Sequence, residues 1–187
     1  MISAIRSRVL RFGKDRRAVG AVEFALIAPV LIVLYIGSLE ISVAMSVNKK
    51  IARAASTVAD LVTQETDVNK ALLTTMVDVA QSVITPFKTD TLKVRVIGIA
   101  VDNAGVAKVA WSWDDTNNKV YPVGTTITVP TELAVKNTFL VRTDVAMDYS
   151  MLMVVPAMQD IQAKTLKMSK TYHLRQRIGD EVTCSNC

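Results

Sequence analysis

The sequence predicts an α+β fold in which a long N-terminal transmembrane helix continues into amphipathic helices and then gives way to a small antiparallel β-sheet domain. Three observations lead to this prediction: an uncharged apolar block near the N-terminus, apolar residues at helical spacing after it, and alternating apolar residues in the second half. The 187 residues suffice for one membrane anchor and one small domain. We expect a basic tail or leader at 1–18, a transmembrane helix at 19–47, juxtamembrane helices at 48–85, a sheet domain at 86–178 and a C-terminal tail at 179–187.

The apolar block reads FALIAPVLIVLYIGSL from Phe24 to Leu39 and continues beyond Glu40 as ISVAMSV. As a helix, Phe24 to Val47 spans roughly 36 Å, which exceeds the hydrocarbon thickness of about 30 Å. Two other interpretations stay open. Ser42-Val43-Ala44 has the small–x–small form of a signal-peptidase site, although the apolar stretch is longer than a usual signal-peptide core. A buried helix of a soluble protein is disfavoured by the length of the block and by the arginines before it.

The basic residues cluster in front of this block. Residues 1–18 contain six of the 22 basic residues and one of the 17 acidic ones, so they carry the whole net charge of +5. The positive-inside rule then predicts a cytoplasmic N-terminus and a single pass through the membrane, with the C-terminal domain on the far side. For a bacterial protein, this corresponds to an inner-membrane anchor with a periplasmic C-terminal domain. The rest of the chain is neutral, which argues against a nucleic-acid-binding surface.

The residues around Glu23 carry a resemblance. Arg16–Phe24, which reads RRAVGAVEF, resembles the processing site of class-IVb prepilins and of the TadE-like pseudopilins of tight-adherence pili. In that family a basic leader ends in glycine, and Glu-Phe or Glu-Tyr stands at the fifth and sixth positions after the cut. The resemblance implies cleavage between Ala18 and Val19, with Glu23 and Phe24 as the recognised pair. Ala18 occupies the position usually held by glycine.

Later segments are also similar to TadE/TadG-like proteins. They are the juxtamembrane stretch NKKIARAASTVADLVTQ, the Trp111-Ser112-Trp113 strand, LKMSKTYHLRQR at Leu166–Arg177, in which Gln176 stands where proline is common, and the tail Val182–Cys187. The resemblance implies a pseudopilin-like subunit or assembly factor of a tight-adherence (Flp-type) pilus that serves adhesion. Its partners would be membrane lipid, other pilin-like subunits, the pilus secretion machinery and a prepilin peptidase. A membrane-anchored envelope binding or sensory protein is the alternative.

The second half predicts the elements of the exported domain. Ile51, Ala55, Val58 and Val62 recur at helical spacing, so the membrane helix is expected to continue to about Val62. A second helix, capped by Thr66 or Asp67, places Leu72, Met76, Val79 and Val83 on one face and stops before Pro86. Strands are expected at Leu92–Val101, Val106–Trp113, Phe139–Tyr149 and Leu166–Leu174, with a short one at Thr125–Val129.

Residues suited to catalysis are few. His173 is the only histidine, and the seven glycines are scattered, so we expect no enzyme activity, no cofactor, no metal site and no small-molecule substrate. Cys184 and Cys187 have redox spacing but end the chain, which favours a structural disulfide over a thiol-exchange site. Trp111 and Trp113 share one strand face and suit core or subunit packing. The small residues that allow close packing of membrane helices are Gly20, Ala21, Ala25 and Ala28.

Overall fold

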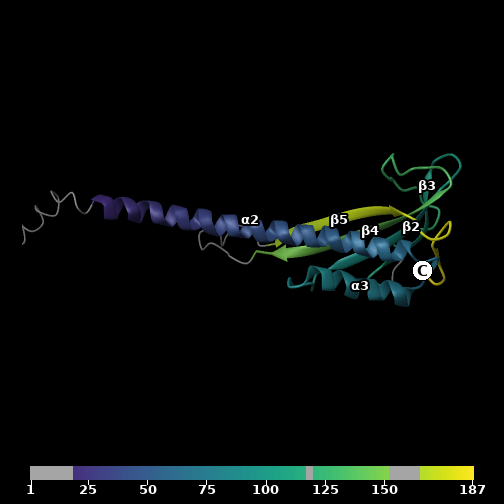
Figure 1. The fold of residues 1–187 in the computed structure, drawn as a ribbon, viewed down its shortest axis with the longest axis horizontal. Helices are drawn as coiled ribbons and strands as arrows, with labels where there is room; N and C mark the ends of the chain where they lie inside the picture. Colours follow the sequence, from purple (N-terminus) through teal and green to yellow (C-terminus); the bar gives the residue numbers. More distant parts are fainter. Residues whose placement is uncertain (1–18, 117–119, 152–164) are drawn as a thin grey trace, which may run out of the picture. The chain divides into compact units, whose positions relative to one another are not determined.

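The computed structural model describes residues 19–116, 120–151 and 165–187. Figure 1 shows two helices and a twisted sheet within these residues, which confirms the α+β prediction. The elements in chain order are α2 (Val19–Thr63), β1 (Asp67–Val68), α3 (Lys70–Ile84), β2 (Lys93–Val101), β3 (Ala107–Asp114), β4 (Thr138–Ser150), β5 (Thr165–Arg175) and β6 (Thr183–Cys184).

Helix α2 contributes to two compact units, which we describe separately. Its residues 19–42 lie in the first unit, and from Val43 onward it belongs to the second, which also holds the sheet. The predicted continuation to about Val62 is confirmed, since the helix ends at Thr63. The predicted apolar stripe from Ile51 to Val62 is also confirmed, because its four members are at most 1% exposed.

Helix α3 begins later than the sequence predicted. Its N-cap is Asn69, whose side chain accepts a hydrogen bond from the backbone N–H of Leu72 at 2.9 Å. The expected caps Thr66 and Asp67 were wrong because Asp67 is committed to β1, where its backbone pairs with Thr183.

The buried face of α3 is turned by about one residue from the predicted one. Of the predicted positions only Met76 is buried, and Leu72, Val79 and Val83 lie half-exposed at its border. The face that packs into the core consists of Leu73, Met76, Ala80 and Ile84. Two adjacent apolar stripes start at the neighbouring residues Leu72 and Leu73, and only packing against the sheet selects between them.

The main sheet has the order β3-β2-β4-β5 with antiparallel neighbours throughout. All four longer predicted strands are confirmed, with ends shifted by a residue or so. The loop after β2 is a turn in which Asp102 Oδ1 accepts hydrogen bonds from the backbone N–H groups of Ala104 and Val106, both at 2.9 Å. Gly105 closes this turn with a φ of +83°, a conformation that favours glycine.

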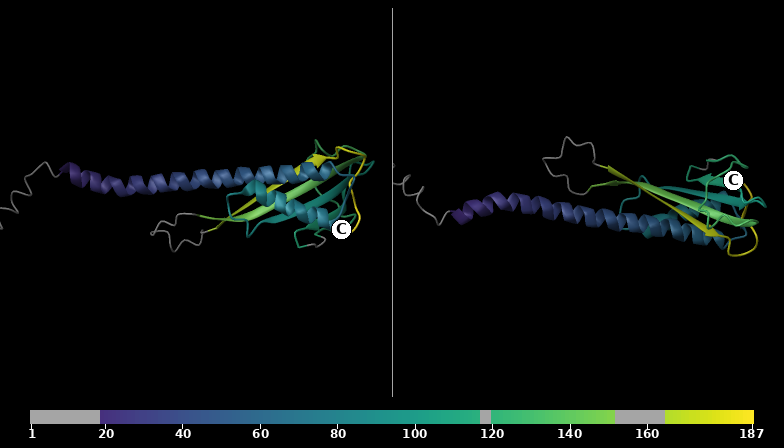
Figure 2. Two further views of the ribbon diagram at one scale, coloured as in Figure 1. Left: turned by 60° about the horizontal axis from the view of Figure 1, so that its bottom comes forward. Right: turned by 90° about the horizontal axis from the view of Figure 1, so that it is seen from above.

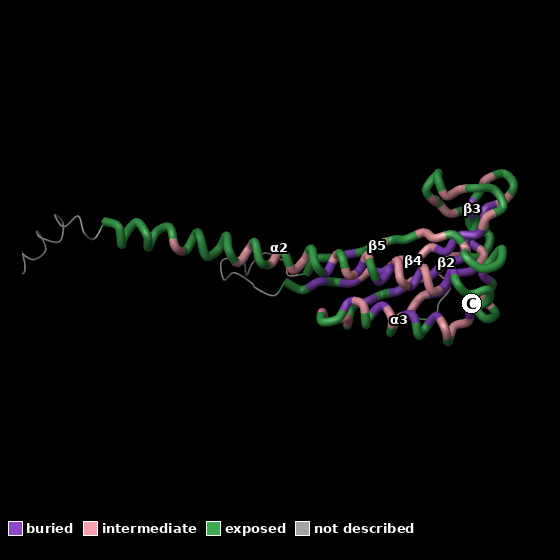
Figure 3. Tube along the Cα trace, viewed as in Figure 1, coloured by how far each residue is buried: buried purple, intermediate pink, exposed green. Residues whose placement is uncertain are grey.

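One face of this sheet carries the larger core. Buried residues of α2, from Val47 onward, and of α3 pack there against buried side chains of all four strands (Figures 2 and 3). Trp111 and Trp113 are 6% and 1% exposed in this core, which confirms their predicted packing role. Gly98 lies beneath Trp111, and a Cβ at this position would come within 2.5 Å of Trp111 Cε2 and 2.8 Å of Phe139 Cζ.

The opposite face, which we call the outer face, is covered over part of its area by residues 120–136. Apolar residues of this segment pack on a second buried cluster that comprises Ile97, Ile99, Val101, Ala107, Val109 and Leu140. The short strand predicted at Thr125–Val129 was wrong, since the described residues there form an isolated bridge between Lys108 and Thr126. Pro122 and Pro130 bracket the segment and keep it from pairing further.

Candidate functional site

The first part of α2 is apolar on all sides, and the described residues do not bury it. Within the described residues, α2 is the helix with the length and composition to cross a membrane, and none of its most apolar window is buried. Phe24 and Leu34, for example, are 69% and 64% exposed. A helix that is hydrophobic around its whole circumference needs a non-aqueous environment.

The residues of the predicted processing site lie on this helix in part. Val19 is the first residue of α2, and Glu23 and Phe24 are exposed on its first two turns. Ala18 lies outside the described residues. No ion pair or hydrogen bond involves the Glu23 side chain within the described part of the chain, so a cationic partner for this carboxylate has to come from elsewhere.

The predicted small-residue face is only partly continuous. At 100° per residue, Ala21, Ala25 and Ala28 fall within an arc of about 60°, whereas Gly20 lies at least about 80° from that arc. All four positions are accessible or half-accessible, and no heavy atom lies within 4 Å of a Cβ built on Gly20. Three of the four therefore define one face on which a second helix can approach.

Lys50 links α2 to the C-terminal end of α3. Its Nζ donates to the backbone oxygens of Thr85 at 2.7 Å and Val83 at 3.3 Å. These carbonyls lie at the negative end of the α3 dipole, where a cation is favoured. Helical spacing contains no signal for such a contact, which joins residues 35 apart in the sequence.

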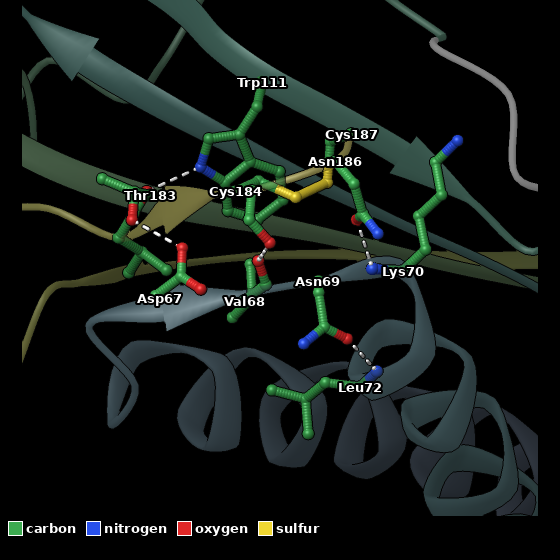
Figure 4. The surroundings of a disulfide bond; sticks show 12 residues. Asp67, Val68, Asn69, Lys70, Leu72, Trp111, Thr183, Cys184, Asn186 and Cys187 are labelled. Carbon is green, nitrogen blue, oxygen red and sulfur yellow. Dashed lines mark hydrogen bonds between the residues drawn. A yellow bond between two sulfur atoms is a disulfide. The ribbon is translucent and has the colours of Figure 1, made fainter.

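The C-terminal residues 176–187, which we call the C-terminal clasp, hold the junction between α2 and α3. Figure 4 shows the disulfide that joins Cys184 and Cys187 beside β1. Asn186 Oδ1 accepts a hydrogen bond from the backbone N–H of Lys70 at 2.8 Å, which satisfies one of the free donors at the start of α3. Trp111 Nε1 donates to the carbonyl of Val182 at 2.7 Å. The clasp thus joins the sheet to the start of α3.

The first residues of the clasp bind the end of α2. Arg177 donates its backbone N–H to Thr63 O at 3.0 Å, and its guanidinium pairs with Asp60 at 2.8 Å. Gln176 Nε2 donates to the backbone oxygens of Glu65 at 2.9 Å and Ile178 at 2.5 Å. Gln176 therefore has a bridging role that the sequence did not predict.

The rest of the outer face is open and charged. Asp144 Oδ1 accepts from Arg142 Nε at 2.9 Å and from Thr171 Oγ1 at 2.6 Å. Beside it lies a shallow hollow of about 210 Å³ whose lining includes Lys93, Arg95 and Asp114. Arg95 Nε is buried without a hydrogen-bond partner. The lining of the hollow combines these two cations with three carboxylates, Asp114, Asp115 and Asp144, so it carries charges of both signs.

His173 lies on this outer face at the register position of Arg142. Burial lowers the pKa of His173 below 6.5, and the positive charge of Arg142 lowers it further, against a smaller opposing effect of Asp144. The side chain of His173 is half-buried. Within the described residues, no group of three or more His, Cys, Asp or Glu side chains is arranged to hold a metal ion.

Comparison with known proteins assigns the N-terminal helix to a family. Residues 18–60 match the model of the family described as TadE-like protein. Searches of curated proteins and of solved structures gave no match. The matched residues cover nearly all of α2, including the predicted processing site from Ala18 onward and most of the stripe that packs into the core. The resemblance seen in the sequence is therefore confirmed over this helix, where residues 18–60 are similar to the TadE-like protein family.

Proposed function

We propose that this protein is a membrane-anchored, pseudopilin-like subunit or assembly factor of a tight-adherence pilus, with a structural and not a catalytic role. The observation that carries the proposal is the TadE-like match over residues 18–60, which falls on a helix whose first half has an apolar and exposed surface. A soluble protein does not leave a surface of that size in water. In the proposal, lipid and neighbouring pilin-like helices cover it.

The proposed orientation has the basic residues 1–18 in the cytoplasm and the sheet domain in the periplasm, with α2 crossing the inner membrane. Fusing a reporter protein that fluoresces only in the cytoplasm to either end tests this arrangement. The N-terminal fusion should fluoresce and the C-terminal fusion should not. A chain that stays in the soluble fraction without detergent would contradict the anchor itself.

Release by signal peptidase at Ala44 is disfavoured by the geometry of α2. Ser42, Val43 and Ala44 lie inside a helix of 45 residues, and Val43 and Ala44 pack against the core next to the fully buried Val47. Proteolysis favours exposed chain that opens readily, and this segment is helical and partly covered.

The proposal also includes removal of the 18-residue leader by a prepilin peptidase, with Glu23 as a recognition residue. Co-expression with such a peptidase should shorten the chain, and mass spectrometry of the product should give Val19 as the new N-terminus. Glu23→Gln should reduce this cleavage. It should also weaken assembly, because a carboxylate that becomes buried between subunits needs a cationic partner, which the freed N-terminal amine of a neighbouring subunit would provide. Glu40→Gln, which changes the other carboxylate on the apolar part of α2, is the matched control. A chain of unchanged mass would establish an uncleaved anchor instead.

One observation favours the alternative of an anchored recognition protein. The hollow on the outer face contains the buried and unpartnered Arg95 Nε, and a buried unsatisfied donor is costly unless something binds it. If recognition is the function, Arg95→Gln should abolish it while pilus assembly in cells continues. If the protein is a structural subunit, Arg95→Gln should leave assembly intact and reveal no other phenotype.

A further inference from the structure

Strand β5 is an edge of the sheet, and its outer side has free backbone groups. The sheet order ends at β5, and the strand runs for 11 residues from Thr165 to Arg175. One hydrogen bond at the end of the strand shows which residues of β5 bond to β4. Gln176, the residue after β5, donates its backbone N–H to the carbonyl oxygen of Phe139 at 3.2 Å. In an antiparallel ladder such pairs alternate. The even-numbered residues of β5 therefore bond to β4, and the odd-numbered ones direct N–H and C=O away from the sheet.

Nothing in the described part of the chain pairs with this outer side. No backbone hydrogen bond between this strand and the described residues outside the sheet involves an odd-numbered residue of β5. Seven of the eleven residues are exposed. Leu166 and Tyr172, on the helix-facing side, are 44% and 38% exposed, so apolar surface accompanies the free edge.

The charge of β5 selects the kind of strand that can pair with it. Lys167, Lys170 and Arg175 are basic, and the strand has no acidic residue. A second copy of β5 would bring basic residues opposite basic residues, which is destabilising in a sheet. Edge lysines of this kind prevent self-association, but they favour an incoming strand that has carboxylates at alternate positions.

We propose that the outer edge of β5 is a docking site for an extended acidic segment of another protein, which adds to the sheet as a fifth strand. In such β-augmentation the backbone provides the affinity and alternate side chains the specificity. Acidic side chains of the incoming strand face Lys167 and its odd-numbered neighbours on the outer face. Apolar ones cover Leu166 and Tyr172 on the other side. The inference goes beyond the anchored-subunit proposal and does not depend on leader removal or membrane orientation.

A synthetic probe tests the docking edge. The probe is a nine-residue peptide of alternating glutamate and valine, and the control peptide has lysine in place of glutamate. The full chain in lipid nanodiscs should bind the acidic peptide, with affinity that falls at high salt, and should ignore the basic one. Hydrogen exchange should slow in β5 on binding. The proposal would be overturned if hydrogen exchange in β5 stayed unchanged at saturating acidic peptide. It would also be overturned if the protein dimerised through β5 by itself.

Variants of the edge separate docking from folding. Ser169→Pro removes an outward N–H and leaves the ladder with β4 intact, so the protein should fold but lose peptide binding. Lys170→Pro removes a ladder donor and should unfold the sheet. Lys167→Glu should weaken binding at least about tenfold through like-charge repulsion, whereas Lys136→Glu, an exposed lysine outside β5, should not. If Ser169→Pro fails to fold, the comparison of Lys167→Glu with Lys136→Glu decides. Equal binding of the acidic peptide by these two variants would refute the docking edge.

Discussion

Replacement of Gly98 by alanine tests how tightly the aromatic core is packed. The added Cβ would lie 2.5 Å from Trp111 Cε2 and 2.8 Å from Phe139 Cζ, about 1 Å inside the usual carbon–carbon contact distance. Neither ring moves freely, because Trp111 is hydrogen-bonded to Val182 and Phe139 is 4% exposed. We expect a loss of about 2–3 kcal/mol in the free energy of unfolding, which is the upper range for overpacking, despite the conformational gain of replacing glycine.

The measurement is urea unfolding of the full chain in detergent, followed by tryptophan fluorescence. Both tryptophans of the protein lie on β3, so the signal reports this core directly. Phe139→Leu on top of Gly98→Ala should restore part of the loss, because a smaller side chain makes room for the methyl group. Gly37→Ala, at a site with no neighbour within 4 Å, is the control and should cost nothing. A Gly98→Ala protein with the wild-type midpoint would mean that the two rings are not held as described.

Four further outcomes follow from the contacts of the second unit. Lys50→Met should lower the free energy of unfolding by about 1 kcal/mol through loss of the bonds at the end of α3, with a smaller effect at high salt, and urea unfolding at two salt concentrations measures it. Replacing Cys184 and Cys187 with serine should cost about 2 kcal/mol for a four-residue loop, and a reductant should remove the difference from wild type. The pKa of His173 is lowered in the folded state, so the unfolded chain binds the proton more readily. The free energy of unfolding should therefore decline as the pH falls below about 6.5, and His173→Gln should flatten this pH dependence. Gln176→Glu should cost about 1–2 kcal/mol by replacing a donor with an acceptor beside backbone oxygens, whereas Gln176→Ala should cost less; equal losses would contradict the bridging role.

The elements that could be predicted are those with a regular apolar pattern along one segment. The stripe from Ile51 to Val62 repeats at helical spacing, and Phe139 to Met147 alternates over nine residues, so each predicts its own buried face. The N-cap of α3 could not be predicted in this way, because Thr66, Asp67 and Asn69 are all suitable cap residues. What decides among them is β1, a strand too short to show alternation.

The parts of the candidate site that consist of neighbouring residues could be predicted from the sequence. The contacts between residues far apart in the sequence could not. The apolar block and the residues around Glu23 can be read from consecutive positions, as can the spacing of Cys184 and Cys187. The contact of Asn186 with Lys70 joins residues 116 apart, and that of Trp111 with Val182 joins residues 71 apart. Polar contacts of this kind depend on the positions of single atoms, so no periodic pattern in the sequence predicts them.

The two halves of α2 differ in how their apolar residues are arranged and covered. From Val47 onward, the apolar residues occupy one side of the helix and are buried by the sheet and α3. Between 19 and 42, residues of the same types surround the whole helix, and no residue there is buried. Within the described residues nothing buries this part of α2, although a helix that is apolar all round is stable only in a protein core or in a membrane. In the anchored subunit that we propose, acyl chains and neighbouring helices would provide that environment, and the face of Ala21, Ala25 and Ala28 would be where small side chains let a neighbouring helix come closest.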